Sequence, residues 1–567
     1  MMPGGPTATS AVTGGGSASP VSRSIPGPPP SPGPSSPSGG FAGTSTLSTR
    51  SCARSPTTLS RPRRSPRGCI SSACWRPYAN PPPREPGSTC RGQAEAAKEV
   101  TVTPRPKIAL LGLTLELYEG MSPGLREGRE RWVRESVLPW LAEVADVEFG
   151  GAVYRRADVD REVARLEAQG ADALLVMLLT YSPSQIALPA LTRTRLPIIV
   201  WNTQELFGVG PGFGGADLVN NHGVHGTQDL CNVLLRSGVN FSYVTSHMAD
   251  ADARARLLDH FAAAAAVARL HRARLGLLGY PFPGMGDFAL DTTHLAATLG
   301  CEWTALSVGE FVDRAAAAPA ERVDALLAEY RASYDIAPGI EPADLEATAR
   351  AELALRGMVG DRDLQAITYQ FAAFGEDERS PTIPFVAASR LMAEGVGFGG
   401  EGDLIACAGM LLVNWLMPPA TFTEIFTIDF AGNGVLMSHM GELNVAMARR
   451  DRRVSLRVRP RPIARTRFRQ TALVASLEPG PATLAALTLG PGGRWRVIAA
   501  SVTIADFGPL DSLEVPHFKV STAGDVRDFL TAYARAGGPH HLALCFGDAR
   551  NRLRLACALL GADYCEV

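Results

Sequence analysis

The sequence predicts an α/β protein in which two Rossmann-like α/β domains are followed by a C-terminal antiparallel, β-barrel-like domain. Short apolar runs alternate with helical stretches from about residue 107, which is typical of βαβ units and a parallel sheet. After about residue 449, short strands are separated by Gly/Pro turns, which is typical of antiparallel or barrel-like domains. The first hundred residues hold too few large apolar side chains to form a core, which predicts disorder.

We therefore expect four parts, of which the first is a Pro/Ser/Arg-rich extension. They are 1–104 (disordered extension), 105–275 (N-terminal α/β domain), 276–445 (central α/β domain carrying the candidate metal-site motifs) and 446–567 (C-terminal β-rich domain). In the N-terminal domain the apolar runs predict strands at 107–112, 147–153, 171–178, 197–201 and 241–245, and the helical patterns cover 126–144, 158–169 and 250–271.

The central domain is expected to open with a strand at 274–281, to continue through a mostly helical region at 308–357, and to end in an α/β part near residue 395. The C-terminal domain is expected to contain strands at 454–458, 471–476, 482–489 and 494–503 and a helix at 523–536.

The net charge of −1 is the sum of two unlike parts of the 567-residue chain. Residues 1–98 carry ten Arg and one Lys against two Glu, a net charge of +9. The remainder carries 44 basic and 54 acidic side chains, a net charge of −10. An acidic body gives no support to nucleic-acid binding, so we expect no nucleic-acid partner.

The basic extension has several interpretations. An Arg- and Ser-rich, acid-poor leader resembles a transit peptide, the Arg cluster at 61–67 could contact nucleic acid, and PxxP-like stretches could contact an SH3-type groove. The favoured interpretation is a dispensable tail, translated upstream of the true start.

No run of 18 or more apolar residues occurs, so no membrane-spanning helix is expected. The ten cysteines show no CxxC pair and no disulfide-framework spacing, which favours a reducing, cytoplasmic compartment.

Two segments place carboxylates in Gly-rich or apolar surroundings. Gly397–Asp403 contains Glu401 among glycines that permit tight turns and a close ligand approach, although a solvated turn is an alternative. The segment lacks a GKS/T sequence, which excludes a Walker phosphate loop. In 421–430, alternation places Glu424 on an apolar strand face with Phe422 and Phe426, where a carboxylate is costly unless it is paired or metal-bound. The alternative is an exposed edge strand.

Two further segments supply histidines. His439 lies between Met437 and Met440, where a satisfied core histidine is the alternative to a ligand. His540 and His541 precede an apolar strand, and because adjacent strand residues point to opposite faces, we expect one site to use only one of them as a ligand, while the other supports that ligand or has a structural role. Oxygen and nitrogen donors without a thiolate favour Mn²⁺ or a similar divalent cation.

A polar cluster in the N-terminal domain is a candidate for binding hydroxyl groups. Asn202 and Gln204 follow an apolar strand at its carboxyl end, the edge at which parallel sheets usually bind ligands. His225 lies in the Asn- and His-rich stretch 220–229, which leads into a helix predicted from Thr227. Ordinary helix capping is the alternative.

Taken in order, these motifs resemble the L-arabinose isomerases and, more distantly, the L-fucose isomerases, over residues 105–567. The family's G-E-G-D motif matches Gly400–Asp403, and its second metal glutamate matches Glu424. Its S-H-M motif matches Ser438–Met440, with Glu442 also in place, and its G-G-x-H-H motif matches Gly537–His541. An N-T-Q stretch matches Asn202–Gln204, and an H-G pair matches His225-Gly226.

The resemblance implies a metal-dependent aldose–ketose isomerase that acts on an open-chain sugar through an enediol intermediate. It implies Mn²⁺ held by Glu401, Glu424, His439 and His541, with the two glutamates also acting as the catalytic acid–base pair. His225, Asn202 and Gln204 would bind the sugar. The resemblance also implies a three-domain subunit in a homotrimer or homohexamer with the active site between neighbours. The alternative is a non-catalytic sugar-binding or regulatory protein that retains the isomerase fold.

The sequence departs from the family pattern around the sugar. Where the family has a glutamine that binds the sugar, this chain has Leu115, which cannot make that hydrogen bond. Leu404-Ile405 replaces a Trp-Lys pair, and Ile425 replaces an aspartate. The resemblance therefore supports the reaction type more strongly than it supports L-arabinose as the substrate.

Overall fold

The structure is a computed structural model that describes residues 105–459, 461–508, 510 and 512–567. The predicted disorder of residues 1–104, and the interpretations of that extension, lie outside the described residues. Within the described part, no helix is long and apolar enough to cross a membrane.

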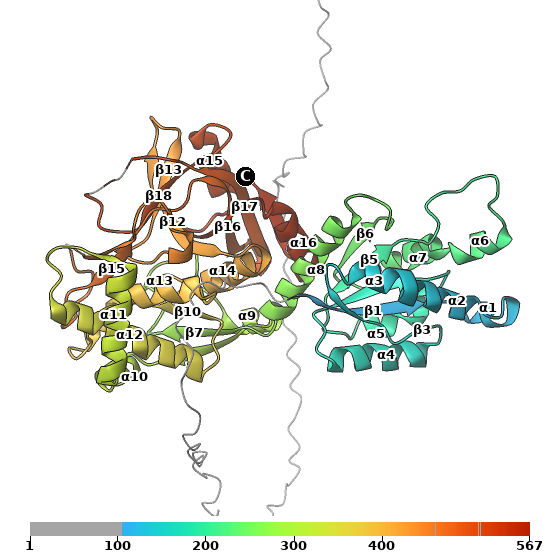
Figure 1. Cartoon of the computed structure of the whole chain (residues 1–567), viewed down its shortest axis with the longest axis horizontal. Helices are drawn as coiled ribbons and strands as arrows, with labels where there is room; N and C mark the ends of the chain where they lie inside the picture. Colours follow the sequence, from blue (N-terminus) through green and yellow to red (C-terminus); the bar gives the residue numbers. More distant parts are fainter. Residues whose placement is uncertain (1–104, 460, 509, 511) are drawn as a thin grey trace, which may run out of the picture. The chain divides into compact units, whose positions relative to one another are not determined.

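The N-terminal domain is built on a parallel sheet in which β3 pairs with β1 beside the main order β2-β1-β4-β5-β6 (Figure 1). Its strands are β1 (Lys107–Leu113), β2 (Asp146–Glu148), β3 (Ala152–Val153), β4 (Ala173–Leu178), β5 (Ile198–Asn202) and β6 (Phe241–Thr245). Its helices are α1 (Glu116–Met121), α2 (Leu125–Trp132), α3 (Leu138–Leu141), α4 (Arg156–Ala168), α5 (Leu188–Leu191), α6 (Gly215–Asn220), α7 (Gly223–Arg236) and α8 (Ala253–Leu270), with a π-helical turn at Val133–Val137 and a 3-10 turn at Ser184–Ile186.

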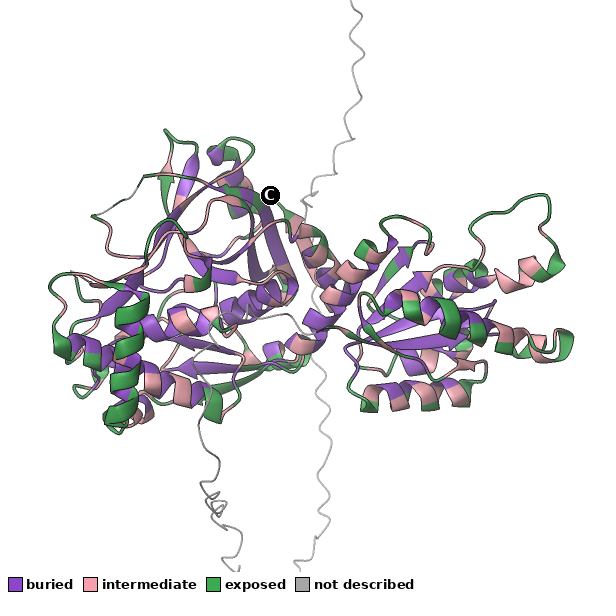
Figure 2. Cartoon of the chain, viewed as in Figure 1, coloured by how far each residue is buried: buried purple, intermediate pink, exposed green. Residues whose placement is uncertain are grey.

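Alternate residues of β1 pack into two separate cores, so helices cover both faces of this sheet. Ile108 and Leu110 belong to the core that includes Phe261 of α8, whereas Leu111 belongs to the core that includes Val163 of α4. Figure 2 shows the strands buried and the outer helix surfaces exposed. The α/β prediction is confirmed in this form, while its finer Rossmann-like description stays a prediction.

The central domain contains a second parallel sheet, of order β11-β10-β7-β8. Its strands are β7 (Arg274–Leu278), β8 (Glu302–Leu306), β10 (Ala366–Tyr369) and β11 (Gly397–Gly399). Its helices are α9 (Thr292–Thr298), α10 (Val308–Ala316), α11 (Ala320–Ser333), α12 (Pro342–Asp361), α13 (Phe385–Ala393) and α14 (Leu404–Leu416), with a 3-10 turn at Phe371–Glu376.

The largest sheet has seven strands in the order β16-β19-β12-β13-β18-β17-β20. They are β12 (Ala420–Asp429), β13 (Gly434–Ser438), β16 (Gly480–Leu489), β17 (Trp495–Ile504), β18 (His517–Ser521), β19 (His541–Phe546) and β20 (Asp563–Glu566). The accompanying helices are α15 (Val526–Arg535) and α16 (Arg550–Leu560), with 3-10 turns at Val445–Met447 and Pro491–Gly493.

This C-terminal sheet is mixed rather than wholly antiparallel, because β20 runs parallel to β17. Since β16 also pairs along its length with β17, the pairing returns to the first strand, which supports the barrel-like prediction without deciding it. The boundary predicted at 445/446 falls after β12 and β13, although both strands belong to this sheet. The predicted strands at 454–458 and 471–476 instead form a small sheet as β14 (Ser455–Val458) and β15 (Thr471–Val474), together with β9 (Asp335–Ile336).

Helix α14 joins the two sheets nearest the candidate site. All but one of its residues are buried, and it packs against β10 and β11 of the parallel sheet and against β12, β16 and β19 of the mixed sheet. A helix that is apolar all round belongs in a core. Because α14 begins directly after Asp403, its packing fixes the position of the preceding Gly-rich turn.

We predict that Leu411→Ala, in the fully buried part of α14, lowers the free energy of unfolding by about 2–5 kcal/mol, because it leaves a cavity in a packed core. Leu235 of α7 is 74% exposed, and Leu235→Ala is the control, with an expected change within about 0.5 kcal/mol. Urea unfolding followed by circular dichroism measures both. Equal changes in the two variants would contradict the central role of α14.

Candidate active site

The first candidate residue, Glu401, lies in a tight turn with a left-handed backbone at two successive residues. Glu401 has a φ of 59° and Gly402 a φ of 86°, both in the left-handed region. A Cβ atom on Gly402 would lie 2.6 Å from the Cα of Pro281 and from the carbonyl oxygen of Tyr280. The Gly402 amide donates to Thr368 Oγ1 (2.9 Å). The turn is therefore clamped between β10 and the segment that follows β7.

The second candidate, Glu424, is positioned by strand register. It lies in β12 directly opposite His541 of β19 on one side and Ser438 of β13 on the other. The alternative of an exposed edge strand is wrong, because β12 has a partner on both sides. Through this register, Glu424 lies beside the two candidate histidines, His439 and His541.

Each of these histidines is held by a carboxylate on its Nδ1 atom. His439 Nδ1 lies 2.5 Å from Glu442 Oε2, and Glu442 also accepts a hydrogen bond from the hydroxyl of Tyr369. His541 Nδ1 lies 2.9 Å from Asp403 Oδ2. With Nδ1 occupied, both rings present Nε2 to the site, as carboxylate–histidine pairs do around metals.

Asp403 and Glu442 each orient a histidine and make one further hydrogen bond. The Asp403 carboxylate orients His541 and also caps α14 by accepting from the Ala406 amide (2.8 Å). Glu442 is 1% exposed and links His439 to Tyr369. The alternative that His439 is a satisfied core histidine is wrong on one side of the ring, because its buried Nε2 makes no hydrogen bond.

Both of the adjacent histidines lie at the site, and the expectation that only one of them is a ligand stays a prediction. Strand β19 begins at His541, so His540 precedes the strand and does not follow its alternation. His540 Nε2 lies 3.6 Å from Glu401 Oε2 and 3.9 Å from Glu424 Oε1. His541 Nε2 lies 2.9 Å from the same Glu424 oxygen.

These donors fit a divalent cation. Glu401, Glu424, His540 and His541 each offer one atom within 4.8 Å of all the others, and His439 Nε2 adds a fifth atom 3.5 Å from Glu424 Oε1. Glu401 Oε2, His439 Nε2 and His540 Nε2 are buried and make no hydrogen bond, and the buried Nε2 atom of His541 faces Glu424 Oε1. Buried polar atoms normally have partners, and carboxylate oxygens with imidazole nitrogens can hold a divalent cation.

Opposite charges inside the site shift its pKa values. Burial raises the pKa of the Glu424 carboxyl, but the imidazoles of His439 and His541 lower this pKa by a larger amount. The pKa of Glu424 therefore lies below its ordinary value. Burial lowers the pKa of His541, whereas the carboxylates of Asp403 and Glu424 raise it, to about 10. The pKa of His439 is raised by Glu442 and Glu424 against the opposing effect of burial. The carboxylates therefore favour positive charge here, which protonated histidines or a bound cation can supply.

Aromatic rings wall the site. Phe288 stacks on His541 with ring centroids 5.6 Å apart, and Phe422 contacts both His439 (4.8 Å) and His541 (5.0 Å) edge-on. Phe398 packs behind Phe422. These apolar walls strengthen the electrostatic interactions between the polar groups they enclose.

The predicted sugar-binding residues form a second polar group in the N-terminal domain. His225 Nδ1 lies 2.9 Å from His222 Nε2, and His222 in turn lies 3.4 Å from the hydroxyl of Tyr118. Tyr181 stacks on His225 with ring centroids 4.6 Å apart. Helix α7 begins at Gly223, earlier than predicted, so His225 lies in its first turn.

Asn202 and Gln204 lie at the end of β5, as expected. Asn202 donates to Thr245 Oγ1 (3.1 Å), and Gln204 donates to the carbonyl of Leu206 (2.7 Å). Among the described residues, no hydrogen bond, ion pair or ring contact joins this group to the glutamate–histidine cluster. The structure therefore brings together the predicted metal-site residues and leaves the predicted sugar-binding residues in a separate group.

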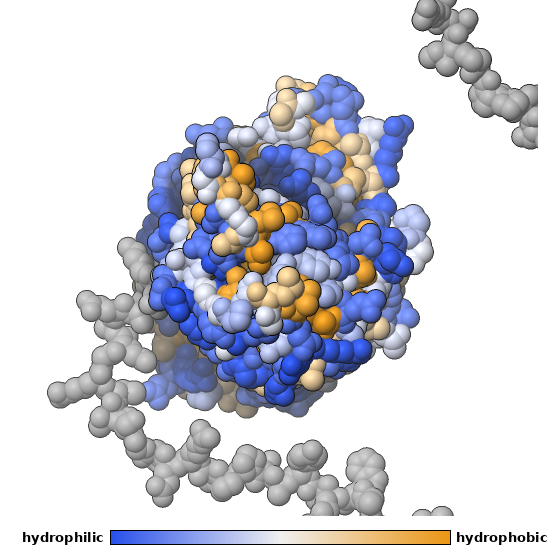
Figure 3. Space-filling view, turned by 90° about the vertical axis from the view of Figure 1, so that its right-hand side faces the viewer, coloured by the Kyte–Doolittle hydropathy of each residue, from blue (hydrophilic) through white to orange (hydrophobic). Residues whose placement is uncertain are grey.

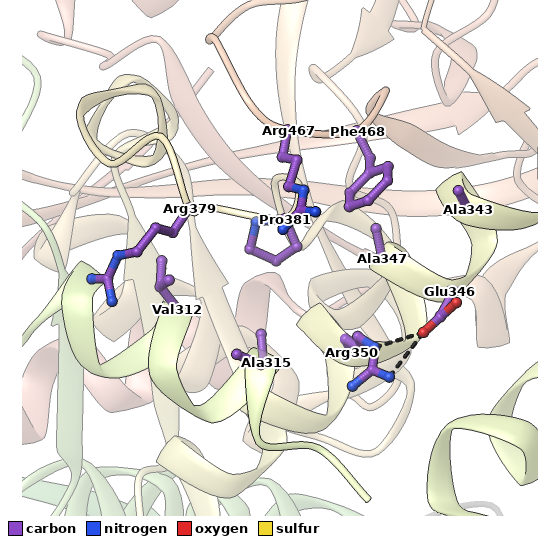
Figure 4. Close-up of a pocket in the computed structure, with 11 residues that line it drawn as sticks. Val312, Ala315, Ala343, Glu346, Ala347, Arg350, Arg379, Pro381, Arg467 and Phe468 are labelled. Atoms are coloured by element: carbon purple, nitrogen blue, oxygen red, sulfur yellow. Dashed lines mark hydrogen bonds and ion pairs between the residues drawn. The ribbon is translucent and has the colours of Figure 1, made fainter. Parts of the chain in front are cut away.

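A cavity of about 340 Å³ lies elsewhere in the described part, between α10, α12 and the segment around Arg467 (Figure 4). Arg350 there is already paired with Glu346. Its lining includes Val312, Ala347, Arg350, Arg379, Arg467 and Phe468, and none of the predicted site residues.

Sequence reasoning did not single out Asp287 and Tyr369, which hold His540 and Glu442. A signal was present, because Tyr369 ends β10, Asp287 follows β7 and Glu401 follows β11, three parallel strands that are neighbours in the sheet. Ligand sites in such sheets form at the carboxyl ends of the strands.

Comparison with known proteins agrees with this geometry. Residues 289–418 match the sequence model of the L-arabinose isomerase central domain, and residues 419–563 match that of its C-terminal domain. The L-arabinose isomerase of Acidothermus cellulolyticus is 29% identical over 420 residues, which cover 70% of this chain and 81% of that protein. That of Nocardioides sp. is 29% identical over 397 residues (67% and 78%), and that of Geobacillus kaustophilus is 26% identical over 443 residues (76% and 87%).

A solved structure of a periplasmic solute-binding protein from Actinobacillus succinogenes with bound D-allose aligns with a TM-score of 0.13 and 15% identity, covering 53% of this chain and 80% of that chain. A likeness this small indicates nothing about fold or function.

The two adjoining domain matches and the named relatives place the chain among the sugar isomerases, which are intramolecular oxidoreductases. The chain is a divergent member of the L-arabinose isomerase family.

We predict that Gly402→Ala destabilises the protein by about 1–3 kcal/mol more than Gly284→Ala, because only Gly402 faces an overpacking clash. Gly284 is the matched control, since its φ of 93° is similarly left-handed but no atom lies within 4 Å of a Cβ there. Differential unfolding of both variants in urea measures the difference. Equal destabilisation would show that the turn is not clamped against Pro281.

Proposed function

We propose that the chain is a metal-dependent aldose–ketose isomerase that acts on an open-chain sugar through an enediol intermediate. The observation that carries this proposal is the convergence of Glu401 and Glu424 with three imidazole Nε2 atoms in one largely buried site. Membership of the L-arabinose isomerase family supports the same reaction.

The proposed cofactor is Mn²⁺, held by Glu401, Glu424, His439 and His541. A donor set of carboxylate oxygens and imidazole nitrogens without thiolate suits this cation. When bound, the cation would polarise the oxygens on C1 and C2 of the sugar and offset negative charge that develops on them. The cation would also allow both glutamates to stay ionised at close range.

The two glutamates supply the proton transfers. One carboxylate removes the proton from C2 and returns it to C1, while the other moves the hydroxyl proton from O2 to O1, so the atoms balance across the isomerisation. Glu401 Oε2 makes no hydrogen bond within the described part of the protein, so no protein donor blocks this carboxylate. Histidine Nδ1 atoms tied to Asp403 and Glu442 keep the rings from rotating during these transfers.

The sugar-binding shell is proposed to include His225, Asn202 and Gln204, supplied by a neighbouring subunit of a homotrimer or homohexamer. The separation of this group from the glutamate–histidine cluster within one chain supports this arrangement. The N-terminal domain also exposes large apolar side chains, among them Leu117, Met121, Phe207, Val209, Leu218 and Val224. Figure 3, in which the N-terminal domain faces the viewer, shows hydrophobic residues on its surface. Exposed apolar side chains often mark protein interfaces.

L-arabinose is the reference substrate by family, but Leu115 at the expected glutamine position favours a different hydroxyl pattern. Leu115 precedes α1, next to the segment that contains Tyr118 of the His222–His225 group. We propose a cytoplasmic location, which is supported by the described cysteines, all of which are free thiols.

A non-catalytic sugar-binding protein would not need two carboxylates beside three oriented histidines. Hydroxyl groups can be bound by neutral amides and alcohols, whereas burying two carboxylates is costly. The isomerase is therefore the proposal that the site supports better.

We predict that the Mn²⁺-loaded protein converts at least one aldose from a panel of pentoses, 6-deoxyhexoses and hexoses to its ketose. Glu401→Gln should lower kcat on that sugar by about 10²–10⁴-fold, because an amide cannot accept the proton. Ketose formation followed by NMR measures both proteins, and exposed Glu378→Gln is the control with unchanged kcat. If the wild type converts no sugar of the panel, the isomerase proposal is wrong. If kcat of Glu401→Gln is close to that of the wild type, Glu401 does not transfer a proton in the reaction.

We predict that two inactive variants, His225→Ala and Glu401→Gln, regain activity when co-expressed. In a ring of subunits with heterologous interfaces, roughly a quarter of the sites in an equal mixture combine an intact Glu401 with an intact His225 from the neighbour. Activity of the purified mixed oligomers, compared with each variant alone, measures this. Mixed oligomers without activity would contradict a site shared between subunits.

A further inference from the structure

Two adjacent residues of the segment that follows β7, Asp287 and Phe288, contact the adjacent histidines of the site. Asp287 Oδ2 accepts from the His540 backbone amide (3.0 Å) and lies 2.6 Å from His540 Nδ1. Phe288, the next residue, stacks on His541 at an interplanar angle of 14°. The dipeptide 287–288 therefore sets the position of the dipeptide 540–541, although 253 residues separate them.

The segment that contains Asp287 and Phe288 also contacts the turn at Glu401. The Phe282 amide donates to the carbonyl of Glu401 (2.9 Å), and Phe288 is 4% exposed. From the other side, the hydroxyl of Tyr533 donates to the carbonyl of Pro539 (2.6 Å), directly before His540. A Cβ atom on Gly538 would lie 2.2 Å from the Tyr533 ring, so the turn before His540 requires glycine.

These contacts orient the Nε2 atom of His540 toward the two glutamates. With Nδ1 and the backbone amide both tied to Asp287, the ring presents Nε2 toward Glu401 Oε2 (3.6 Å) and Glu424 Oε1 (3.9 Å). That Nε2 atom is buried and makes no hydrogen bond. The His540 side chain is 37% exposed, whereas the other members of the cluster are at most 12% exposed, so His540 forms the solvent-facing wall of the site.

We propose that His540 is a substrate-binding residue whose Nε2 pairs with a hydroxyl group of the open-chain sugar, and that Asp287 is the positioning residue that holds it there. A hydroxyl group both donates and accepts, so it pairs with Nε2 in either protonation state of the ring. The position beside both glutamates places this hydroxyl at the reacting end of the sugar. This inference rests on the proposed isomerase function and adds a residue pair to its substrate site.

The solvent-facing position distinguishes this role from that of a metal ligand. Of the proposed metal ligands, Glu401, His439 and His541 are buried and the Glu424 side chain is 12% exposed. His439 and His541 are oriented by the buried carboxylates of Glu442 and Asp403. His540 is oriented by Asp287, which is itself 37% exposed. An arriving sugar meets His540 before it meets the buried groups.

The test uses acyclic pentitols and hexitols, beginning with L-arabinitol, because these reduced sugars present hydroxyl groups but have no carbonyl to isomerise. Calorimetry of the Mn²⁺-loaded full chain gives the Kd of the tightest-binding polyol, and titration of the metal-free chain gives the Kd of Mn²⁺. We expect His540→Gln and Asp287→Asn each to raise the polyol Kd about tenfold, the loss of one hydrogen bond, and to raise KM for the sugar. The Mn²⁺ Kd should stay within about twofold of the wild type, since no ligand is removed.

Asp291→Asn is the matched control, because Asp291 is an exposed residue of the same segment that caps α9 and does not contact His540. Its polyol and Mn²⁺ affinities should equal those of the wild type. An unchanged polyol Kd in His540→Gln and Asp287→Asn, a Mn²⁺ Kd that rises as much as the polyol Kd, or a wild type that binds no polyol would overturn the inference. Absence of wild-type turnover would instead sink the isomerase proposal alone, since polyol binding needs no reaction.

Discussion

The mutual attraction of the carboxylates of Glu401 and Glu424 and the imidazoles that face them is the interaction on which the rest of this structure depends. Leaving such polar atoms buried without partners is costly, so the surrounding chain must hold them in place. Each of the three histidines has a carboxylate near its Nδ1 atom, and Glu442 and Asp403 are in turn held by Tyr369 and by the Ala406 amide. The result is a preorganised set of donors that a divalent cation can satisfy.

The contacts that hold the site also join separate parts of the fold. Register between β12, β13 and β19 places Glu424 beside His439 and His541, so the mixed sheet alone assembles three of the four proposed metal ligands. Asp403 links this sheet to the parallel sheet through the start of α14. The segment after β7 contacts both the turn at Glu401 and the histidine pair. A change in packing of either sheet would therefore displace the donors of the site.

Much of this organisation could be predicted from the sequence, because local patterns determine it. Continuous apolar runs identified β1, β4 and β5, since strands that are buried on both faces carry few polar residues. Motif resemblance identified Glu401, Glu424, His439 and His541. The orientation of the His540 side chain could not be predicted, because it depends on β19 beginning at His541, which leaves His540 outside the strand. The role of Asp287 depends on a contact across 253 residues, for which a single sequence carries no pattern.

The central claim is that side chains from the turn after β11, from β12, from the end of β13 and from the start of β19 hold one divalent cation. Crystals of the full chain grown with Mn²⁺, measured at the manganese absorption edge, test it most directly. The account predicts one anomalous peak at bonding distance from Glu401, Glu424, His439 and His541, with His540 beside it but not bound. A peak elsewhere, or no peak in this cluster at saturating Mn²⁺, would contradict the account.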